Sequence, residues 1–249
     1  MLKATGVSKS FGALQATNNV SLELQPGARH ALIGPNGAGK TTFFNLLTGE
    51  IFPDEGRIEL DGQDVTKASA DRRARAGLGR SFQRNNLFEH ETVRQNLLFA
   101  DIAAQGYGWQ FWRRLSADRR ANGLAEAVAA QVGLSDALET RVTSLSYGAR
   151  RQLEVGLALI GQPKVLLLDE PAAGMSADET DRMMALIDTL PRNLAVLIVE
   201  HDMDLVFAHA DRITVLAQGE VLFEGTPEEV RASALVQETY LGEAEDASC

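Results

Sequence analysis

A glycine-rich loop near the N-terminus is the sequence feature that most restricts the fold of this chain. It fits the pattern Gly-x-x-x-x-Gly-Lys-Thr in full. Its residues are Gly34, Pro35, Asn36, Gly37, Ala38, Gly39, Lys40 and Thr41. A short strand, Arg29–Ile33, precedes the loop, and a helix over 41–48 follows it. This order predicts a phosphate-binding loop (P-loop) in an α/β fold, because loop amides and a helix N-terminus together attract phosphate.

The residue types in the P-loop predict a nucleoside triphosphate and magnesium as ligands. The glycines let the backbone wrap a phosphate chain, and Lys40 would reach the β- and γ-phosphates. The hydroxyl of Thr41 would bind Mg²⁺, and Thr42 is expected in the same phosphate site. We therefore expect ATP and Mg²⁺ as the cofactors.

An apolar strand that ends in two carboxylates supplies the second part of such a site. Residues 165–168 are Val-Leu-Leu-Leu, and Asp169 and Glu170 follow them. We expect Asp169 to hold Mg²⁺ through water. Glu170 would orient and polarise the water that attacks the γ-phosphate.

The rest of the first and last thirds predicts strands alternating with helices. The pattern over 20–24 predicts a half-buried strand, and that over 58–60 another. The runs 165–168 and 194–199 are continuously apolar, as is typical of parallel strands buried on both faces. Further expected elements are a helix at 177–190 opened by Ser176 and Glu179, a hairpin of 213–216 and 221–223, and a final helix opened by Thr226 and Pro227.

The middle of the chain, about 87–160, has a different composition. It is rich in Ala, Leu, Arg and Gln, and the strand pattern disappears. Residues 121–132 and 147–160 are expected to be helices. We interpret the whole stretch as a helical lobe inserted into the α/β core.

Composition and charge exclude several classes of protein. A chain of 249 residues that is 45% hydrophobic can bury a core. Its net charge of −10 argues against nucleic acid as a partner, because such proteins usually carry a basic surface. The only cysteine is Cys249, so no internal disulfide forms, which fits a reducing compartment. No apolar run approaches the ~20 residues that span a bilayer, so any membrane role is expected to come through a partner.

Residues 145–149, Leu-Ser-Tyr-Gly-Ala, resemble the signature Leu-Ser-Gly-Gly-Gln of ATP-binding-cassette (ABC) ATPases. Ser146 and Gly148 match this signature, whereas Tyr147 and Ala149 depart from it. The resemblance implies that Ser146 and the helix behind it face the γ-phosphate held by an opposite subunit. The alternative is that Ser146 only caps its own helix.

Three single residues complete the set by resemblance to the same family. Gln83 is similar to the glutamine that contacts Mg²⁺ or water and senses the membrane subunit. His201 is similar to the switch histidine that contacts the γ-phosphate. Phe11 stands where the family stacks an aromatic ring on adenine, although a core phenylalanine competes with that interpretation. Ser176 stands where the family usually has an aspartate, and its capping role competes with signalling between subunits.

The resemblance covers about residues 2–242 and implies the fold. That fold is an α/β P-loop NTPase of the ABC cassette type, with a mostly parallel core sheet, an antiparallel β subdomain and an inserted helical lobe. We expect one domain over 1–249. Its expected parts are a core of about 1–86 and 161–242, a helical lobe of about 87–160, and a tail of 243–249.

Finer features resemble the ATP-binding subunits of importers of branched-chain, hydrophobic amino acids. They are Tyr147, the run 170–175 and the run 111–114. The resemblance implies permease subunits as partners and a peripheral location on the cytoplasmic face of the inner membrane. It also implies a second cassette, identical or a sister subunit, and a solute-binding protein outside. Related importers carry urea or short amides, so the solute stays open.

Residues 109–120 form a further stretch whose role stays open. They join aromatic side chains to four arginines, which suits either a packed helix with a solvated basic end or a contact with permease or lipid headgroups.

Two other functions compete with transport. A non-transport ABC ATPase acting on ribosomes or DNA would usually carry two cassettes or a long coiled-coil insertion. A small-molecule kinase with this P-loop would not need the signature serine or the histidine.

Overall fold

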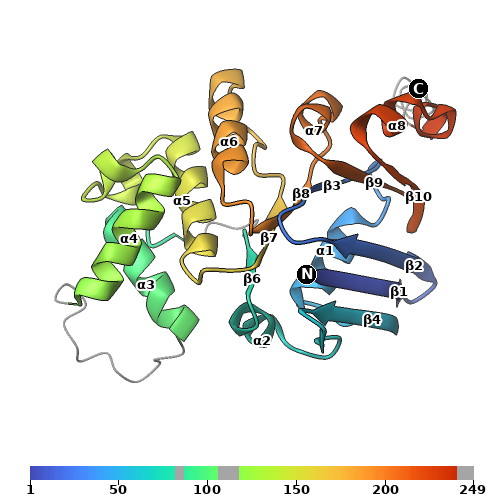
Figure 1. The fold of residues 1–249 in the computed structure, drawn as a ribbon, viewed down its shortest axis with the longest axis horizontal. Coiled ribbons are helices and arrows are strands. Elements are labelled where there is room, and N and C mark those ends of the chain that lie inside the picture. Colours follow the sequence, from blue (N-terminus) through green and yellow to red (C-terminus); the bar gives the residue numbers. More distant parts are fainter. Residues whose placement is uncertain (82–86, 106–117, 240–249) are drawn as a thin grey trace.

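The computed structural model describes residues 1–81, 87–105 and 118–239. Figure 1 shows a central sheet, with strands β1, β2 and β4 of a second sheet at one end and helices α3, α4 and α5 at the other. This arrangement of a mostly parallel sheet, an antiparallel sheet and a group of helices confirms the predicted fold class.

The central sheet has six strands in the order β10-β9-β3-β8-β7-β6. Its neighbours pair in parallel except for β9 and β10, which form the predicted hairpin. The strands are β3 (Arg29–Ile33), β6 (Leu78–Arg80), β7 (Val165–Asp169), β8 (Ala195–Val199), β9 (Arg212–Ala217) and β10 (Glu220–Gly225). Every residue of β3, β7 and β8 is buried, as expected for strands covered on both faces.

The second sheet is antiparallel, with the order β2-β1-β4-β5. The strands are β1 (Leu2–Phe11), β2 (Leu14–Leu24), β4 (Glu55–Leu60) and β5 (Gln63–Asp64). Its apolar face packs with helix α1 (Lys40–Thr48) in one buried cluster that includes Val20, Ile58, Phe43 and Leu47. This packing fixes the helix that follows the P-loop between the two sheets.

The predicted helix boundaries lie close to the observed ones where local signals define them. Helix α1 ends at Gly49, which adopts the left-handed conformation with φ of 81°. Helix α6 (Ala177–Thr189) begins with the expected capping box of Ser176 and Glu179, and α8 (Pro227–Ala232) begins with that of Thr226 and Glu229. In the described residues, the remaining helices outside the middle segment are α2 (Ala70–Arg75), α7 (Met203–His209) and a helical stretch at 234–239.

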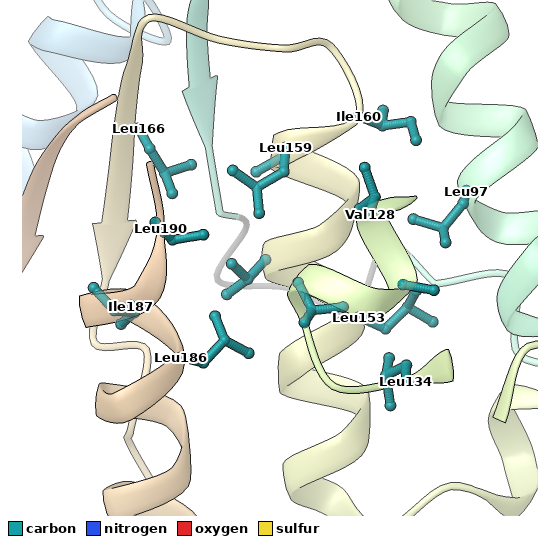
Figure 2. Close-up of a cluster of buried hydrophobic side chains, with 14 of the residues drawn as sticks. Leu97, Val128, Leu134, Leu153, Leu159, Ile160, Leu166, Leu186, Ile187 and Leu190 are labelled. Carbon is teal, nitrogen blue, oxygen red and sulfur yellow. The ribbon is translucent and has the colours of Figure 1, made fainter. Parts of the chain in front are cut away.

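In its described part, the segment between β6 and β7 contains helices α3 (Val93–Gln105), α4 (Arg119–Gln131) and α5 (Tyr147–Leu159), with short 3₁₀ turns between α4 and α5. Figure 2 shows that α5 lies in the middle of the apolar packing. Leu153 lies beside Leu97 and Val128, whereas Leu159 faces Leu166 of β7. Helix α5 therefore joins the helical segment to the central sheet.

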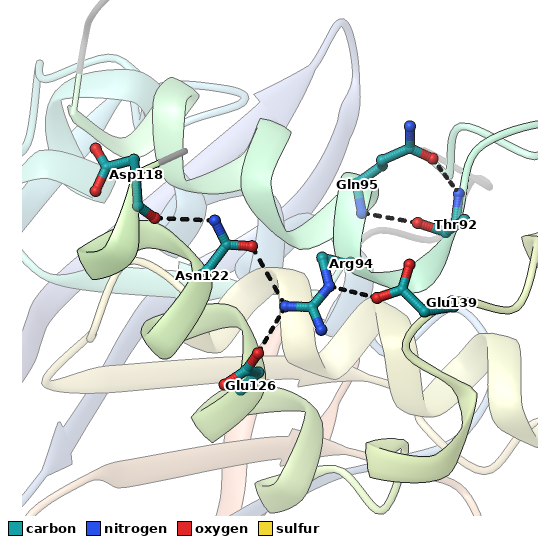
Figure 3. Close-up of polar contacts among 7 residues, drawn as sticks. All are labelled: Thr92, Arg94, Gln95, Asp118, Asn122, Glu126 and Glu139. Carbon is teal, nitrogen blue, oxygen red and sulfur yellow. Dashed lines mark hydrogen bonds and ion pairs between the residues drawn. The ribbon is translucent and has the colours of Figure 1, made fainter. Parts of the chain in front are cut away.

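A polar cluster on the outside of the helices ties α3 to its neighbours (Figure 3). The guanidinium of Arg94 donates from Nε to Glu139 at 2.6 Å and from Nη1 to Glu126 at 2.9 Å. Nη1 also donates to Asn122 at 3.3 Å. One arginine thus holds α4 and the turn at 135–142 against α3.

A fully buried arginine stabilises the end of the helix that carries the P-loop. Arg73 of α2 has no exposed surface, and its guanidinium donates to the carbonyl oxygens of Leu46 and Leu47 in the last turn of α1. It also donates to the carbonyls of Thr66 and Ala68, each at 3.0 Å. Burial lowers the pKa of Arg73 to about 10. The positive charge suits the negative end of the α1 dipole.

Replacing Arg73 with Met should therefore lower the free energy of unfolding by about 2–4 kcal/mol, because buried carbonyls at the end of α1 lose their donors. Denaturant unfolding followed by circular dichroism measures this change. The matched control is Arg72→Met, since Arg72 is the exposed neighbour on the same helix and should change stability by less than about 0.5 kcal/mol. Equal stability of the two variants would contradict the capping role.

Candidate active site

The P-loop follows β3 and is held tightly by its surroundings. Gly34 has φ of 153° and Gly39 has φ of 98°. A Cβ atom at Gly34 would come within 2.2 Å of the Leu216 carbonyl oxygen, and one at Gly39 within 2.3 Å of the Ala16 carbonyl oxygen. Glycine is therefore required at both positions, because the backbones of β9 and β2 leave no room for a Cβ atom.

Lys40 lies at the first position of α1, and its ammonium group crosses the loop. It donates to the carbonyl oxygen of Gly34 at 2.5 Å and to that of Pro35 at 2.9 Å. The first turn of α1 carries no acidic residue. The loop thus joins a cation to a helix N-terminus, which is the electrostatic setting that phosphate requires.

The predicted acids and histidine meet at the carboxyl edge of the central sheet. Asp169, the last residue of β7, is 7% exposed, and its amide donates to the hydroxyl of Ser81 at 3.1 Å. Glu170 follows with φ of 46°, an uncommon conformation for a residue other than glycine. The imidazole Nδ1 of His201 lies 3.4 Å from the carboxylate of Glu170. The structure therefore brings Glu170 and His201 together.

A further acid at this edge was not singled out from the sequence. Glu200, directly after β8, is 2% exposed, and burial raises the pKa of its carboxyl group. Its signal was present, because an apolar strand that ends in an acid is the same pattern that pointed to Asp169.

Ser146 starts helix α5 and caps it. Its backbone is extended, and its hydroxyl accepts the amide N–H of Ala149 at 3.2 Å. Within the described part of the chain, no hydrogen bond joins Ser146 to the P-loop. The cap is thus observed, whereas the contact with a γ-phosphate stays a prediction.

Within the chain, Tyr147, which departs from the signature, and Gly148, which matches it, both make structural contacts. The hydroxyl of Tyr147 donates to the carbonyl oxygen of Ala173 at 2.9 Å, and Arg151 packs over the Tyr147 ring. The amide of Gly148 donates to Glu179 at 3.2 Å, the same carboxylate that completes the capping box of α6. The signature helix is therefore tied directly to the segment after Glu170.

Phe11 is not a core residue, because 49% of its surface is exposed at the end of β1. The ammonium of Lys9 lies 5.7 Å from the ring centroid, and it is held there by Asp54 at 2.7 Å. The β1–β2 hairpin reaches the P-loop through Ala16. An exposed aromatic ring on the hairpin that contacts the phosphate loop is available for stacking on a base.

Gln83 and most of the 109–120 stretch lie outside the described residues. Of that stretch, Asp118 caps α4, and Arg120 pairs with the buried carboxylate of Asp101 at 2.6 Å. Among the helices of the described residues, none combines the length and apolar character needed to cross a membrane.

Comparison with known proteins identifies the class. The sequence model of the ABC transporter family matches residues 17–173. A second model, described as the branched-chain amino acid ATP-binding cassette transporter, matches residues 220–246. The chain belongs to the family of ABC transporter ATP-binding subunits, and it is an ATPase.

Within that family the chain is similar to proteins of branched-chain amino acid transport. It is 39% identical to the high-affinity branched-chain amino acid transport ATP-binding protein BraF of Pseudomonas aeruginosa, with 98% of both chains covered. It is 41% identical to LivG, a protein of the same description from Escherichia coli K12, again with 98% of both chains covered.

Solved structures agree with the fold. An ATP-binding cassette of an ABC transporter in its ADP conformation superposes with a TM-score of 0.87 at 28% identity, covering 97% of this chain and 98% of the other. A nucleotide-free cassette of an ABC transporter gives a TM-score of 0.85 at 27% identity, covering 96% and 98%.

If Phe11 stacks on adenine, Phe11→Ala should weaken ATP binding by about 1–3 kcal/mol. Phe11→Tyr should bind ATP nearly as the wild type does. Calorimetry measures both affinities, with inorganic tripolyphosphate as the control ligand, because it lacks a base and should bind all three proteins equally. Unchanged ATP affinity in folded Phe11→Ala would exclude Phe11 from the base site.

Proposed function

We propose that this chain is the ATP-hydrolysing subunit of an importer of branched-chain amino acids or similar small solutes. The support is the similarity along the whole chain to ATP-binding proteins of branched-chain amino acid transport, together with the C-terminal match to the same group. In this proposal the chain lies on the cytoplasmic face of the inner membrane. It is bound there to permease subunits that receive the solute from an extracytoplasmic binding protein.

The carboxyl edge of the central sheet would carry out hydrolysis. Residues 34–42 and Lys40 in particular would hold the phosphates, and Phe11 the adenine. Mg²⁺ fits the donors present, because Thr41 and Asp169 offer the oxygen ligands that it prefers, and it keeps several waters. When bound, the ion would offset the negative charge of the phosphates.

Glu170 would orient the attacking water, and His201 would contact the γ-phosphate. Gln83 would complete the metal and water contacts and respond to the permease. This assignment is supported by the 3.4 Å distance between His201 Nδ1 and the Glu170 carboxylate. Both residues lie at the carboxyl edge of the sheet, where β3 leads into the P-loop.

The complete site would be shared between two cassettes. Ser146 and Gly148 lie at the start of α5, and in the described part of the chain their hydrogen bonds go to Ala149 and Glu179, not to the P-loop. Each chain would therefore offer its signature helix to the γ-phosphate bound by the other. ATP would hold the two cassettes together and hydrolysis would release them, which drives the permease.

The domain organisation belongs to the same proposal. A single cassette over 1–249 would consist of the core at about 1–86 and 161–242 and the lobe at about 87–160. Contacts of α5 with both the lobe helices and β7 would carry movement between them.

Glu170→Gln keeps the shape of the side chain and removes the base, so hydrolysis should slow by about 10²–10⁴-fold. ATP should then persist between two cassettes, and light scattering should detect a dimer in Mg-ATP but not in Mg-ADP. The measurement is made on the chain alone and with its sister subunit. Monomeric Glu170→Gln under both conditions would contradict the shared site.

Adding Ser146→Arg should abolish that dimer, because a bulky cation at the N-terminus of α5 is disfavoured and blocks phosphate. The ATP affinity of the monomer should survive. The matched control is Ser69→Arg, the same change at the exposed first position before α2, which should leave the dimer intact. Loss of ATP binding by monomeric Ser146→Arg would place Ser146 in its own chain's site.

A further inference from the structure

Glu200 is a buried acid at the centre of the carboxyl edge of the sheet, and the hydrolytic roles above do not use it. It follows β8, which lies between β3 and β7. Its side chain is 3% exposed, and its backbone amide points to the Leu32 carbonyl of the P-loop strand. It therefore stands between the strand that opens the P-loop and the strand that ends in Asp169.

Glu200 contacts His201 and the segment that follows Glu170. One carboxylate oxygen accepts the amide N–H of Ala172 at 3.4 Å, two residues beyond Glu170. The other accepts the amide N–H of His201 at 3.3 Å and lies 3.8 Å from its Nδ1. A single side chain thus connects the Glu170 segment with the histidine.

Accepting two hydrogen bonds from backbone amides does not by itself require a carboxylate at this position. Burying the charge costs several kcal/mol unless a cation offsets it, whereas an uncharged amide or hydroxyl could accept the same bonds. In the part of the chain that the structure describes, the only basic side chain paired with Glu200 is His201. The carboxylate of Glu200 therefore faces the imidazole of His201.

The imidazole of His201 is flanked on one side by two acids. Glu170 lies 3.4 Å and Glu200 lies 3.8 Å from the same nitrogen, Nδ1. Carboxylates beside one ring nitrogen fix the ring orientation by binding that nitrogen. This arrangement leaves the other nitrogen, Nε2, for the phosphate. The ring itself is largely exposed, so it needs such a restraint to keep one orientation.

We propose that Glu200 is a positioning residue for ATP hydrolysis that holds His201 and the segment after Glu170 in their working arrangement. This inference rests on the proposed roles of Glu170 and His201. In this proposal Glu200 acts through the imidazole of His201 and not directly on phosphate or water.

Glu200→Gln removes the charge and keeps the size of the side chain. It should lower kcat by about 10–100-fold, the range found when a residue that orients an imidazole is removed. KM and the affinity for ATP should stay unchanged, because the P-loop contacts remain. Single turnovers with enzyme in excess keep slow variants measurable. The matched control is Asp204→Asn, an exposed acid on α7, which should leave kcat unchanged.

A double-mutant cycle separates positioning from simple structural support. In the His201→Ala background, Glu200→Gln should cause no further fall in kcat. A second variant, Glu200→Asp, keeps the charge but withdraws it by one methylene, and it should also lower kcat without changing KM. It serves as the test if Glu200→Gln does not fold.

Three results would overturn the inference: an unchanged kcat in folded Glu200→Gln, a rise in KM as large as the fall in kcat, or an equal fall in the His201→Ala background. Failure of the proposed function looks different. In that case Glu170→Gln and His201→Ala would themselves retain wild-type turnover.

Discussion

The parallel register of β3, β8 and β7 is the constraint on which the site depends. Leu32 pairs with Val199, and Val199 pairs with Asp169, so the three strands end at one level. Each strand is buried throughout, so a shift by one residue would exchange the side chains that pack on its two covered faces. Packing of an apolar sheet therefore fixes where the P-loop begins and where Asp169, Glu170 and Glu200 stand.

The edge that this register creates is electrostatically divided. On the β3 side, Lys40 and the N-terminus of α1 attract negative charge. On the β7 and β8 side, Glu170 and Glu200 flank His201, and Asp169 ends β7. Such a boundary would suit a phosphate chain with Mg²⁺, because the loop offers positive potential and the acids offer oxygen ligands. Arg73 stabilises the opposite end of α1 by binding its last carbonyl oxygens.

Local signals in the sequence predicted much of the fold. The boundaries of β3, the end of α1 at Gly49 and both capping boxes follow from residues that are neighbours in the chain. The short strand β6 was not predicted, because three residues are too few to show a period. Arg73 was not predicted as a cap, since its carbonyl partners on α1 lie 26 and 27 residues earlier.

The positions of the P-loop and of Asp169 at strand ends could be predicted from the sequence, because each motif lies in one continuous segment. The sequence pattern marks Glu200 as an acid at a strand end, but its burial follows from the strand order, which places β8 between β3 and β7. The link from Tyr147 to Ala173 likewise joins two segments whose spacing in the sequence says nothing about contact. The roles of all the predicted site residues, with Gln83, Ser146 and Phe11 among them, stay predictions.

The central claim is that two chains share each site, and complementation between two inactive variants tests it most directly. Lys40→Ala lacks the phosphate contact but keeps its signature helix, whereas Ser146→Arg keeps the P-loop but loses the helix. Each alone should show ATP turnover near background. Mixed, they form pairs in which the P-loop of one chain meets the intact signature of the other, so turnover should rise well above the sum of the two variants. A mixture no more active than that sum, under conditions where the wild-type chain turns over ATP, would contradict the shared site.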